Sequence, residues 1–270
     1  MIKIGHSDVI GWEHAIRGMR NSMNSWDKSD SRQTTDPSNE DIVVDKDCAG
    51  LFNFVIGPND QVLMNRLSKL GPDHRKFMRM ITVYMDITAP LYWWKEFDTY
   101  KVGTVANSCS TMHKLMEKEF SIDDFSHEHL SDYDLNIIID NPYEHHVTYC
   151  GGETSLKRTV DLLNYYRTTY LIIKSLSPSS IIEVIGPNRW NDVPGSNNEE
   201  KKEALAKRYW WMIIQLLPTS YNQKRTVMLN YEVLANIYKS RKNHKLDEWR
   251  IFCEEVKRSL PYSSLFTKGE

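Results

Sequence analysis

Two polar residues flank a short segment in the C-terminal part of the sequence, Asn230 and Arg241. An apolar pattern at three- and four-residue spacing indicates a helix here, formed by Leu229, Val233, Leu234, Ile237 and Tyr238. Roughly three helical turns, or about 16 Å, would separate the two polar side chains. An amide reads hydrogen-bonding edges and a guanidinium is a fixed charged fork, so the pair could bind the two ends of one elongated ligand. The alternative is a surface helix with an ordinary Asn and Arg.

A second stretch with chemical potential runs from Ile87 to Met112. A strand-like pattern leads into Ala89-Pro90, then an aromatic helix, then a polar loop that contains Gly103. Glycine lets the backbone approach a ligand closely, and small side chains supply hydrogen-bonding groups. The loop offers Thr104, Asn107, Ser108, Ser110 and Thr111. Such residues also cap helices, so a purely structural role is the alternative.

The segment from Leu217 to Trp249 resembles the C-terminal signature of the flavin-dependent thymidylate synthases, the ThyX family. Leu217-Pro218, Asn230 and Arg241 fall at the family's spacing, whereas His244 and the Asp-Glu-Trp run that ends at Trp249 follow about one place out of step. The resemblance implies that Asn230 and His244 bind the flavin. It also implies that Arg241 lies near the nucleotide base, as a catalytic and substrate-binding residue.

The polar loop is similar to the family motif RHRxxSxNxxSxR, with which it aligns without a gap, although most of the motif residues are different. Thr99, Tyr100 and Lys101 stand where the family has Arg-His-Arg, so only the last position keeps its charge. Thr104 stands at a Ser position and Asn107 at an acidic one. The resemblance places Thr99, Tyr100, Lys101 and Asn107 with the cofactor, in a divergent member that lacks the Arg-His-Arg motif.

The same alignment implies a set of substrate-binding residues: Glu96, Ser108, Cys109, Thr111, Arg241 and Arg20. Glu96 takes the place of a base-reading Gln, Cys109 that of the active-site Ser, and Thr111 that of a nucleotide-binding Arg. Arg20 matches the place of an N-terminal family Arg, while Ile214 occupies another position that is normally Arg.

The lost arginines matter because Arg binds phosphate by a charged bidentate fork that Thr or Ile cannot form. Charge-assisted hydrogen bonds contribute roughly 1.5–3 kcal/mol each. Losing two would weaken a nucleotide phosphate site by orders of magnitude unless other cations compensate. The candidates for compensation are Lys101, Lys114, Lys224 and Arg225.

Cys109 invites a second reading, as a catalytic nucleophile. A thiol is a better nucleophile than a hydroxyl when a nearby cation lowers its pKa, and Lys101 or His113 could do so. The alternative is that Cys109 is an inert small apolar residue.

Composition narrows the class of protein. The 270 residues carry a formal net charge of −2, which gives no electrostatic basis for nonspecific nucleic-acid or membrane binding. No stretch approaches the length of a membrane span, no CxxC pair occurs, and a cytoplasmic location is expected. The His127-Glu128-His129 run lacks metal-ligand spacing, so we expect solvated side chains and no metal.

Strand patterns concentrate early and helix patterns late, which predicts an α+β fold with a helical C-terminal half. We expect one domain over residues 1–270, with a central antiparallel or mixed sheet as in the ThyX fold. Loops are predicted at 21–47 and 177–198, and an irregular stretch at 131–155. A strand followed by a helix is predicted over 1–20 and again over 76–94. Further helices are predicted at 59–70, 112–130, 156–176 and 199–216.

The resemblance implies an FAD-dependent enzyme that converts dUMP to dTMP, with methylenetetrahydrofolate as carbon donor and NADPH as co-substrate. It also implies a homo-oligomer, most often a tetramer, whose sites lie between subunits. The aromatic triplets Tyr92-Trp93-Trp94 and Tyr209-Trp210-Trp211 could supply the interface, or pack inside one subunit. Two further hypotheses stay open: an inactive, regulatory nucleotide- or flavin-binding relative, and an enzyme that acts on another pyrimidine nucleotide.

Overall fold

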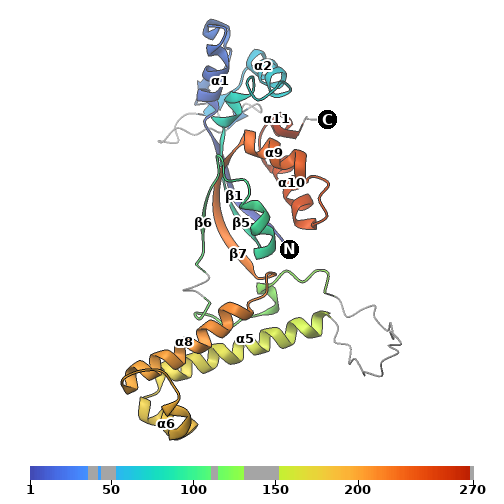
Figure 1. Ribbon diagram of the computed structural model, residues 1–270. Helices are drawn as coiled ribbons and strands as arrows, with labels where there is room; N and C mark the ends of the chain where they lie inside the picture. The colour runs from blue at the N-terminus through green and yellow to red at the C-terminus, as the bar shows by residue number, and fades with distance from the viewer. Residues whose placement is uncertain (36–41, 44–52, 111–114, 131–151, 268–270) are drawn as a thin grey trace, which may run out of the picture. The chain divides into compact units, whose positions relative to one another are not determined.

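The computed structural model describes residues 1–35, 42–43, 53–110, 115–130 and 152–267 of the chain, without the side chains at 42, 43, 53, 152 and 153 (Figure 1). The chain divides into two compact units. The first, called the sheet unit, comprises residues 2–109 and 223–270; the second, called the helical unit, comprises Met1 and residues 110–222. That the two act as one domain stays a prediction. Among the described helices, none is long and apolar enough to cross a membrane.

A four-stranded sheet, with the order β1-β5-β7-β6, forms the centre of the sheet unit. Its strands are β1 (Lys3–Ile10), β5 (Thr82–Pro90), β6 (Val105–Ser108) and β7 (Asn222–Asn230). β1 runs antiparallel to β5 and β6 antiparallel to β7, with Val9 opposite Val83 and Asn107 opposite Thr226. Alternate residues of β5 and β7 are buried, as expected for a sheet with one face on a core.

Helices supply the other layer of this core. They are α3 (Leu91–Phe97), α9 (Tyr231–Arg241), α10 (Asp247–Ser259) and α11 (Ser264–Thr267), with the 3₁₀ turn η2 (Lys76–Arg79). Figure 1 shows α9 and α10 beside the sheet. The fully buried rings between the layers include Trp12, Trp93, Trp94, Tyr231 and Trp249. The predicted strand-to-helix transition at Pro90 is confirmed, since β5 ends at Pro90 and α3 begins at the next residue. Proline suits the extended position that precedes a helix because its ring fixes φ.

The predicted C-terminal helix is confirmed, but it starts later than its apolar pattern indicated. Leu229 belongs to β7, and Asn230 is the N-cap of α9. The Asn230 Oδ1 atom accepts a hydrogen bond from the Val233 N–H at 3.0 Å, which satisfies one of the free donors at a helix start. Arg241 is the last residue of the helix, so the two polar residues do flank it.

The N-terminal part of the sheet unit holds α1 (Trp12–Asn21) and α2 (Pro58–Ser68). Trp12, Ile16 and Met19 are buried on one face of α1, as predicted. The predicted loop at 21–47 is confirmed only in part where the structure describes it, at residues 22–25 and 29–31. It contains the 3₁₀ turn η1 (Trp26–Lys28), β2 (Arg32–Thr34) and β3 (Ile42–Val43), and both strands pair with β4 (Asn53–Val55). Pairing with a distant strand orders a polar segment that composition alone assigns to a loop.

The helical unit is built on α5 (Gly152–Ser175) and α8 (Asn198–Leu216), which lie side by side in Figure 1. Both helices were predicted. The predicted loop at 177–198 is confirmed only at 192–197, because α6 (Pro178–Ile185) and α7 (Pro187–Asn191) lie in the rest. Ser177 accepts a hydrogen bond from the Ser180 N–H, and proline opens each helix. A Ser cap followed by Pro is a helix-start signal that the Pro-, Asn- and Ser-rich composition concealed.

The helix predicted at 112–130 is also wrong over its described part. Residues 115–130 form turns and the 3₁₀ helix η3 (Ile122–Asp124). The Asn164 side chain on α5 accepts from the Phe120 N–H and donates to the Phe120 carbonyl, both at 2.8 Å. Ser121 and Asp124 then form a capping box. Tertiary hydrogen bonds therefore replace the helical ones. The predicted irregular stretch at 131–155 lies outside the described residues up to 151, and α5 begins at Gly152.

The structure is a mixture of helices and antiparallel strands, so the predicted α+β class is confirmed.

Candidate functional site

Arg241 lies at the C-terminal end of α9, where three polar side chains from other segments meet it. Its Nε donates to the Tyr100 hydroxyl at 2.9 Å, and its Nη1 donates to Glu96 Oε2 at 2.6 Å. The His244 Nε2 atom is 2.9 Å from the same Nη1. The structure thus brings together four residues that the sequence assigned separately to substrate and cofactor. We call Glu96, Tyr100, Arg241, His244 and Trp249 the Arg241 cluster.

Trp249 joins this cluster to the core. Its ring is fully buried against Trp93 and Phe97, while its indole N–H donates to Glu96 Oε2 at 2.9 Å. The Arg241 guanidinium carbon lies 4.8 Å from the Trp249 ring centroid, within cation–π range. A rigid aromatic base therefore fixes both the carboxylate and the guanidinium. Sequence reasoning recorded Trp249 only as part of a signature run and missed this positioning role.

His244 lies between the backbone and the guanidinium. The Leu246 N–H donates to His244 Nδ1 at 3.2 Å, and the other ring nitrogen, Nε2, is the one beside Arg241 Nη1. Nε2 lies 3.5 Å from Glu96 Oε2. One carboxylate oxygen therefore accepts hydrogen bonds from both Arg241 and Trp249 and lies beside the His244 ring.

Unused hydrogen-bonding capacity remains at the open side of the cluster. The side chains of Arg241 and Glu96 are 18% and 34% exposed. Within the described part of the chain, Arg241 Nη2 and Glu96 Oε1 make no hydrogen bond. A planar ligand edge that combines an acceptor with a donor could meet both atoms at once. The arrangement is suited to reading a ring edge.

Asn230 lies at the other end of α9, against the polar loop. Gly103 has a φ of +77°, and a Cβ added there would approach Asn230 Nδ2 to 2.9 Å and Val233 Cγ2 to 3.3 Å. Glycine is needed for this backbone conformation and this close contact. The adjacent Thr104 hydroxyl is buried and has no hydrogen-bond partner. A buried polar group without a partner is uncommon in folded proteins, so this hydroxyl is a candidate contact for a ligand.

The other residues assigned to the polar loop are not gathered around Arg241. The Thr99 hydroxyl donates to the Glu96 carbonyl at 2.7 Å at the end of α3. Lys101 is exposed. Asn107 and Ser108 are exposed on β6, opposite Thr226 and Arg225. Thr111 lies outside the described residues, as do His113 and Lys114.

Two of the cations expected to replace the lost arginines are already paired. Lys224 Nζ lies 2.8 Å from Asp86 Oδ2, and Arg225 Nη1 lies 2.8 Å from Asp98 Oδ1. Arg225 also lies over the Trp94 ring, 4.2 Å from its centroid. Hydrogen bonds from Lys224 and Thr226 lower the pKa of Asp86. Lys101 is the described candidate that keeps its charge available.

Ile214, at the remaining family Arg position, packs against a hydrophobic cluster of the helical unit. An apolar residue is therefore what its surroundings accept, and the change from Arg has a local structural reason.

Cys109 is exposed at the end of β6. Its backbone pairs with Lys224 and with the Gln223 side chain, whereas its thiol makes no hydrogen bond to any described residue. That Cys109 is a nucleophile therefore stays a prediction. Cys253 is different: it is buried in α10, and burial raises the pKa of its thiol to about 12, with Glu254 adding to the shift and Arg241 opposing it.

Arg20 lies at a separate place in the sheet unit, on a buried carboxylate. Its Nε and Nη2 both lie 2.7 Å from Asp60 Oδ1. The side chains of Arg20 and Asp60 are 7% and 0% exposed. The second oxygen, Asp60 Oδ2, accepts from the hydroxyls of Ser29 and Ser31 at 2.7 and 2.6 Å. We call these residues the Arg20–Asp60 anchor.

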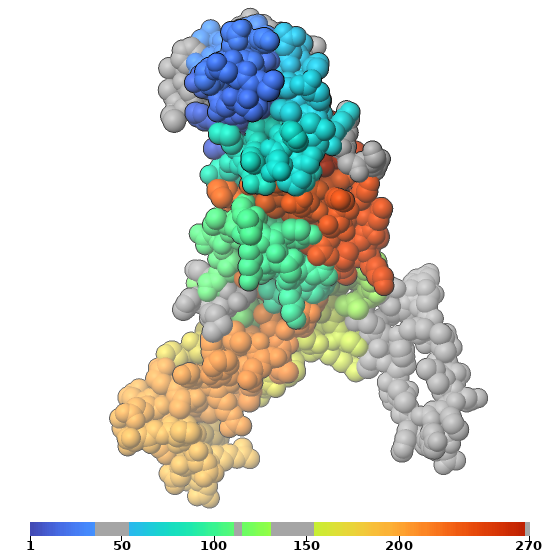
Figure 2. Space-filling model, turned by 45° about the horizontal axis from the view of Figure 1, so that its top comes forward, coloured from blue at the N-terminus to red at the C-terminus, as the bar shows by residue number. Residues whose placement is uncertain are grey.

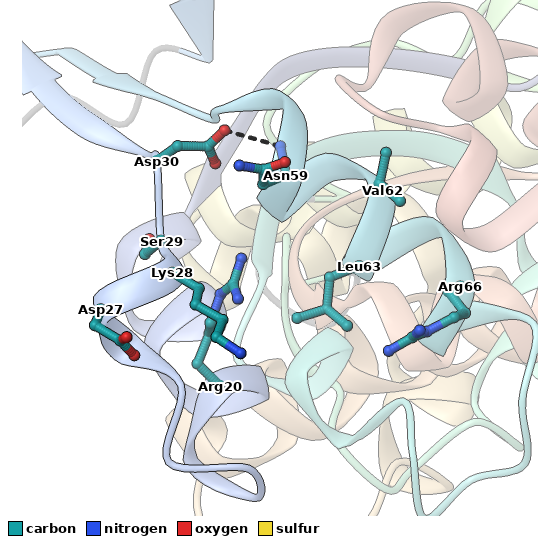
Figure 3. A pocket seen from close by; sticks show the side chains of 9 residues that line it. All are labelled: Arg20, Asp27, Lys28, Ser29, Asp30, Asn59, Val62, Leu63 and Arg66. Atoms are coloured by element: carbon teal, nitrogen blue, oxygen red, sulfur yellow. Dashed lines mark hydrogen bonds between the residues drawn. The ribbon is translucent and has the colours of Figure 1, made fainter.

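Arg20 and Ser29 of this anchor line a cavity of about 630 Å³ (Figure 3). Lys28 lies beside Arg20, and Leu63 and Arg66 of α2 lie across the hollow. Asp30 accepts hydrogen bonds from the Asn59 and Asp60 N–H groups at the start of α2, at 2.9 and 3.1 Å. The predicted substrate-binding Arg20 thus lines a cavity, but its guanidinium is bonded to Asp60.

The described residues contain no group of three or more His, Cys, Asp or Glu side chains arranged to hold a metal ion.

Comparisons with known proteins identify the fold. No protein-family model matches the chain, and the search of curated proteins finds no match. A solved structure of the flavin-dependent thymidylate synthase ThyX from Helicobacter pylori, complexed with FAD and dUMP, is 17% identical; the match covers 98% of this chain and 97% of that chain with a TM-score of 0.50. A second Thymidylate Synthase X structure from that organism, with FAD and dUMP, is 16% identical, covers 98% and 95%, and has a TM-score of 0.51. The likeness shows a ThyX-like fold.

Proposed function

We propose that this protein is an FAD-dependent, thymidylate synthase-like enzyme that acts on a pyrimidine deoxynucleotide. The observation that carries the proposal is the Arg241 cluster, in which a partly exposed guanidinium and carboxylate are held on a buried Trp249. The ThyX-like fold supplies the context, since both matched structures hold FAD and dUMP. The proposed reaction converts dUMP to dTMP, with methylenetetrahydrofolate as carbon donor and NADPH as reductant.

In this proposal Arg241 binds the pyrimidine ring. Its Nη2 donates to a carbonyl of the base, while Glu96 Oε1 accepts the ring N–H. Tyr100 and Trp249 hold the guanidinium in place through Nε and its face, so little rotamer entropy is lost when the ligand binds. His244 contacts both Arg241 and Glu96 and helps to hold the two side chains in place. Arg241 and Glu96 therefore act as binding and orienting groups.

The flavin is proposed to bind along the polar loop and the start of α9. The residues present fit the edge of a ring, because Thr104 has a buried hydroxyl without a partner and Gly103 allows close approach. They fit the phosphates less well, since Lys224 and Arg225 are paired and Lys101 alone is available among the described candidates. FAD would supply the redox chemistry of the reaction. We expect binding weaker than that of a site with Arg-His-Arg.

The test is the purified protein's visible spectrum, followed by titration calorimetry with FAD. We expect flavin absorption or, for protein that lost its cofactor, a saturable heat. Thr104→Val removes the partnerless hydroxyl and should weaken FAD binding about tenfold or more. Thr159→Val is the matched control, because its hydroxyl donates to the Ser155 carbonyl on α5. No heat and no spectral change with FAD would refute the proposal.

Turnover is tested separately, by following dTMP formation from dUMP with FAD, NADPH and methylenetetrahydrofolate. Binding of FAD and dUMP without any dTMP would reduce the proposal to a nucleotide- and flavin-binding protein.

Oligomerisation is part of the proposal. Trp93 and Trp94 are buried in the sheet unit, so these two rings of the first triplet pack inside one subunit. In the second triplet Trp211 is 43% exposed on α8, and it is our candidate for a subunit contact. We propose a homotetramer, to be checked by light scattering of the wild type and of Trp211→Glu. A stable wild-type monomer at low micromolar concentration would remove the inter-subunit site.

A further inference from the structure

We propose that a small basic hollow between α2, η2 and the C-terminal helices binds a phosphate group, at a place distinct from the Arg241 cluster. The hollow has a volume of about 100 Å³. Four basic side chains line it: Lys69, Arg75, Lys239 and Lys242. They come from three separate segments, the end of α2, the residue before η2 and the end of α9.

The packing of these segments brings the cations together. α2 contacts α11, and η2 contacts α9. Figure 2 shows the segment that holds α2 (cyan) against the C-terminal helices (orange to red). Lys69 follows the last turn of α2, while Lys239 lies in the last turn of α9 and Lys242 follows it. The floor is apolar, with Leu265 and Phe266 buried beneath.

Arg75 is the second observation that indicates a ligand. Its Nε lies 3.1 Å from Glu232 Oε2, so the two form an ion pair. Both atoms are buried and neither makes an aligned hydrogen bond. Within the described residues the guanidinium therefore has charge compensation but unused donors. An arginine fork with free donors is the side chain best suited to a tetrahedral oxyanion.

A simpler explanation is that the lysines only offset the negative ends of two helices. Each helix C-terminus carries roughly half a negative charge, so two ends carry about one. In the described part of the chain no carboxylate pairs with Lys69 or Lys239. Their two positive charges exceed the negative charge of about one at the two helix ends. The negative charge of Glu232 neutralises the positive charge of Arg75. Lys242 lies 5.9 Å from the Tyr238 ring centroid, and its charge is not counted. A positive excess remains that helix ends do not explain.

The size of the hollow sets the ligand class. Pockets for whole drug-sized ligands measure about 300–1,000 Å³, so this one accepts a single compact group. A phosphate group, free or at the end of a phosphomonoester whose remainder stays in solvent, matches both the size and the charge.

The test is saturable thermal stabilisation of the full-length protein by inorganic phosphate, with NaCl added to hold the ionic strength constant. We expect Lys69→Gln combined with Lys239→Gln to weaken phosphate binding about tenfold or more. The control is Lys207→Gln combined with Lys257→Gln, two exposed lysines on α8 and α10 that change the net charge equally. Arg241→Lys should leave this binding unchanged, because its contacts lie elsewhere.

Three outcomes would overturn the proposal: no saturable effect on the wild type, an equal loss in both double variants, or loss in Arg241→Lys. A phosphomonoester without a base, ribose 5-phosphate, distinguishes the two sources of the group. If it binds with the same dependence on Lys69 and Lys239, the site accepts a terminal phosphoryl group. If only inorganic phosphate binds, the free ion is the ligand.

Discussion

Two arginines that look alike in the sequence occupy opposite environments. Arg20 is 7% exposed on its side chain, and its guanidinium is held by a fully buried Asp60. Arg241 is 18% exposed, and its partner Glu96 is 34% exposed. The Arg20–Asp60 anchor ties α1 and α2 to the loop that carries Ser29 and Ser31. The Arg241 cluster instead leaves one guanidinium nitrogen and one carboxylate oxygen available.

The difference separates a structural ion pair from a binding one. A buried pair costs a great deal when one partner is removed, because the other charge is left without solvent or compensation. A partly exposed pair contributes little to stability, since water screens it, but it can exchange its partner for a ligand. Each of the following experiments tests whether the two pairs differ in this way.

The largest effect is expected for Arg20→Ala. Removing the guanidinium leaves Asp60 charged and buried, so the free energy of unfolding should fall by about 3–5 kcal/mol in urea titrations. Arg66→Ala, an exposed residue of the same cavity, should change it by less than about 0.5 kcal/mol. If Arg20→Ala kept full stability but lost ligand affinity, Arg20 would bind substrate, as the resemblance implies. Its ion pair with Asp60 would then not be structural.

A pH titration tests the same pair without removing a side chain. Burial alone would raise the pKa of Asp60, but hydrogen bonds from Ser31, Ser29 and Arg20 and the Arg20 charge outweigh it, so the pKa is lowered. A lowered pKa in the folded state gives stability that is present above the unfolded pKa of about 4 and is lost as the pH falls below it. We expect wild-type stability to drop in that window. Asp60→Asn should be less stable at pH 7 and lack this part of the acid dependence.

Arg241→Lys should produce a smaller effect, and on binding rather than on folding. Lysine keeps the charge but loses the planar fork and its contacts with Tyr100 and Glu96, so nucleotide affinity should fall by roughly 1–3 kcal/mol. The melting temperature of the ligand-free protein should stay close to that of the wild type. A loss of stability as large as the loss of affinity would make Arg241 structural, like Arg20.

The smallest effect is expected for Glu96→Gln. The ion pair with Arg241 is partly exposed, so its removal should cost less than about 1 kcal/mol of unfolding free energy. Because Glu96 Oε1 is proposed to accept the ring N–H of the base, affinity for the pyrimidine nucleotide should fall in calorimetry, by less than in Arg241→Lys. Unchanged or higher affinity would mean that Glu96 does not contact the base. Glu183→Gln on α6 is the control for the change in net charge.

Much of the fold was predictable where local signals are strong. The apolar spacing of Trp12, Ile16 and Met19 correctly predicted α1, and similar patterns predicted α2, α5 and α8. The misses have a common cause. β2 exists because it pairs with β4, and the 115–130 segment is held by Asn164 of α5. Contacts far along the chain overrode the local pattern.

For the candidate site, the sequence by itself determined which side chains are present, and its resemblance to a family indicated Arg241, Glu96 and His244. It also determined the cap at Asn230, since a cap depends on residues three positions apart. Only the tertiary structure decided what each arginine does. Arg20 meets a carboxylate 40 positions away and Arg241 one 145 positions away. Partner and burial over such separations depend on how the whole unit packs, because a charge is structural or available according to the solvent and the counter-charge that the fold leaves beside it.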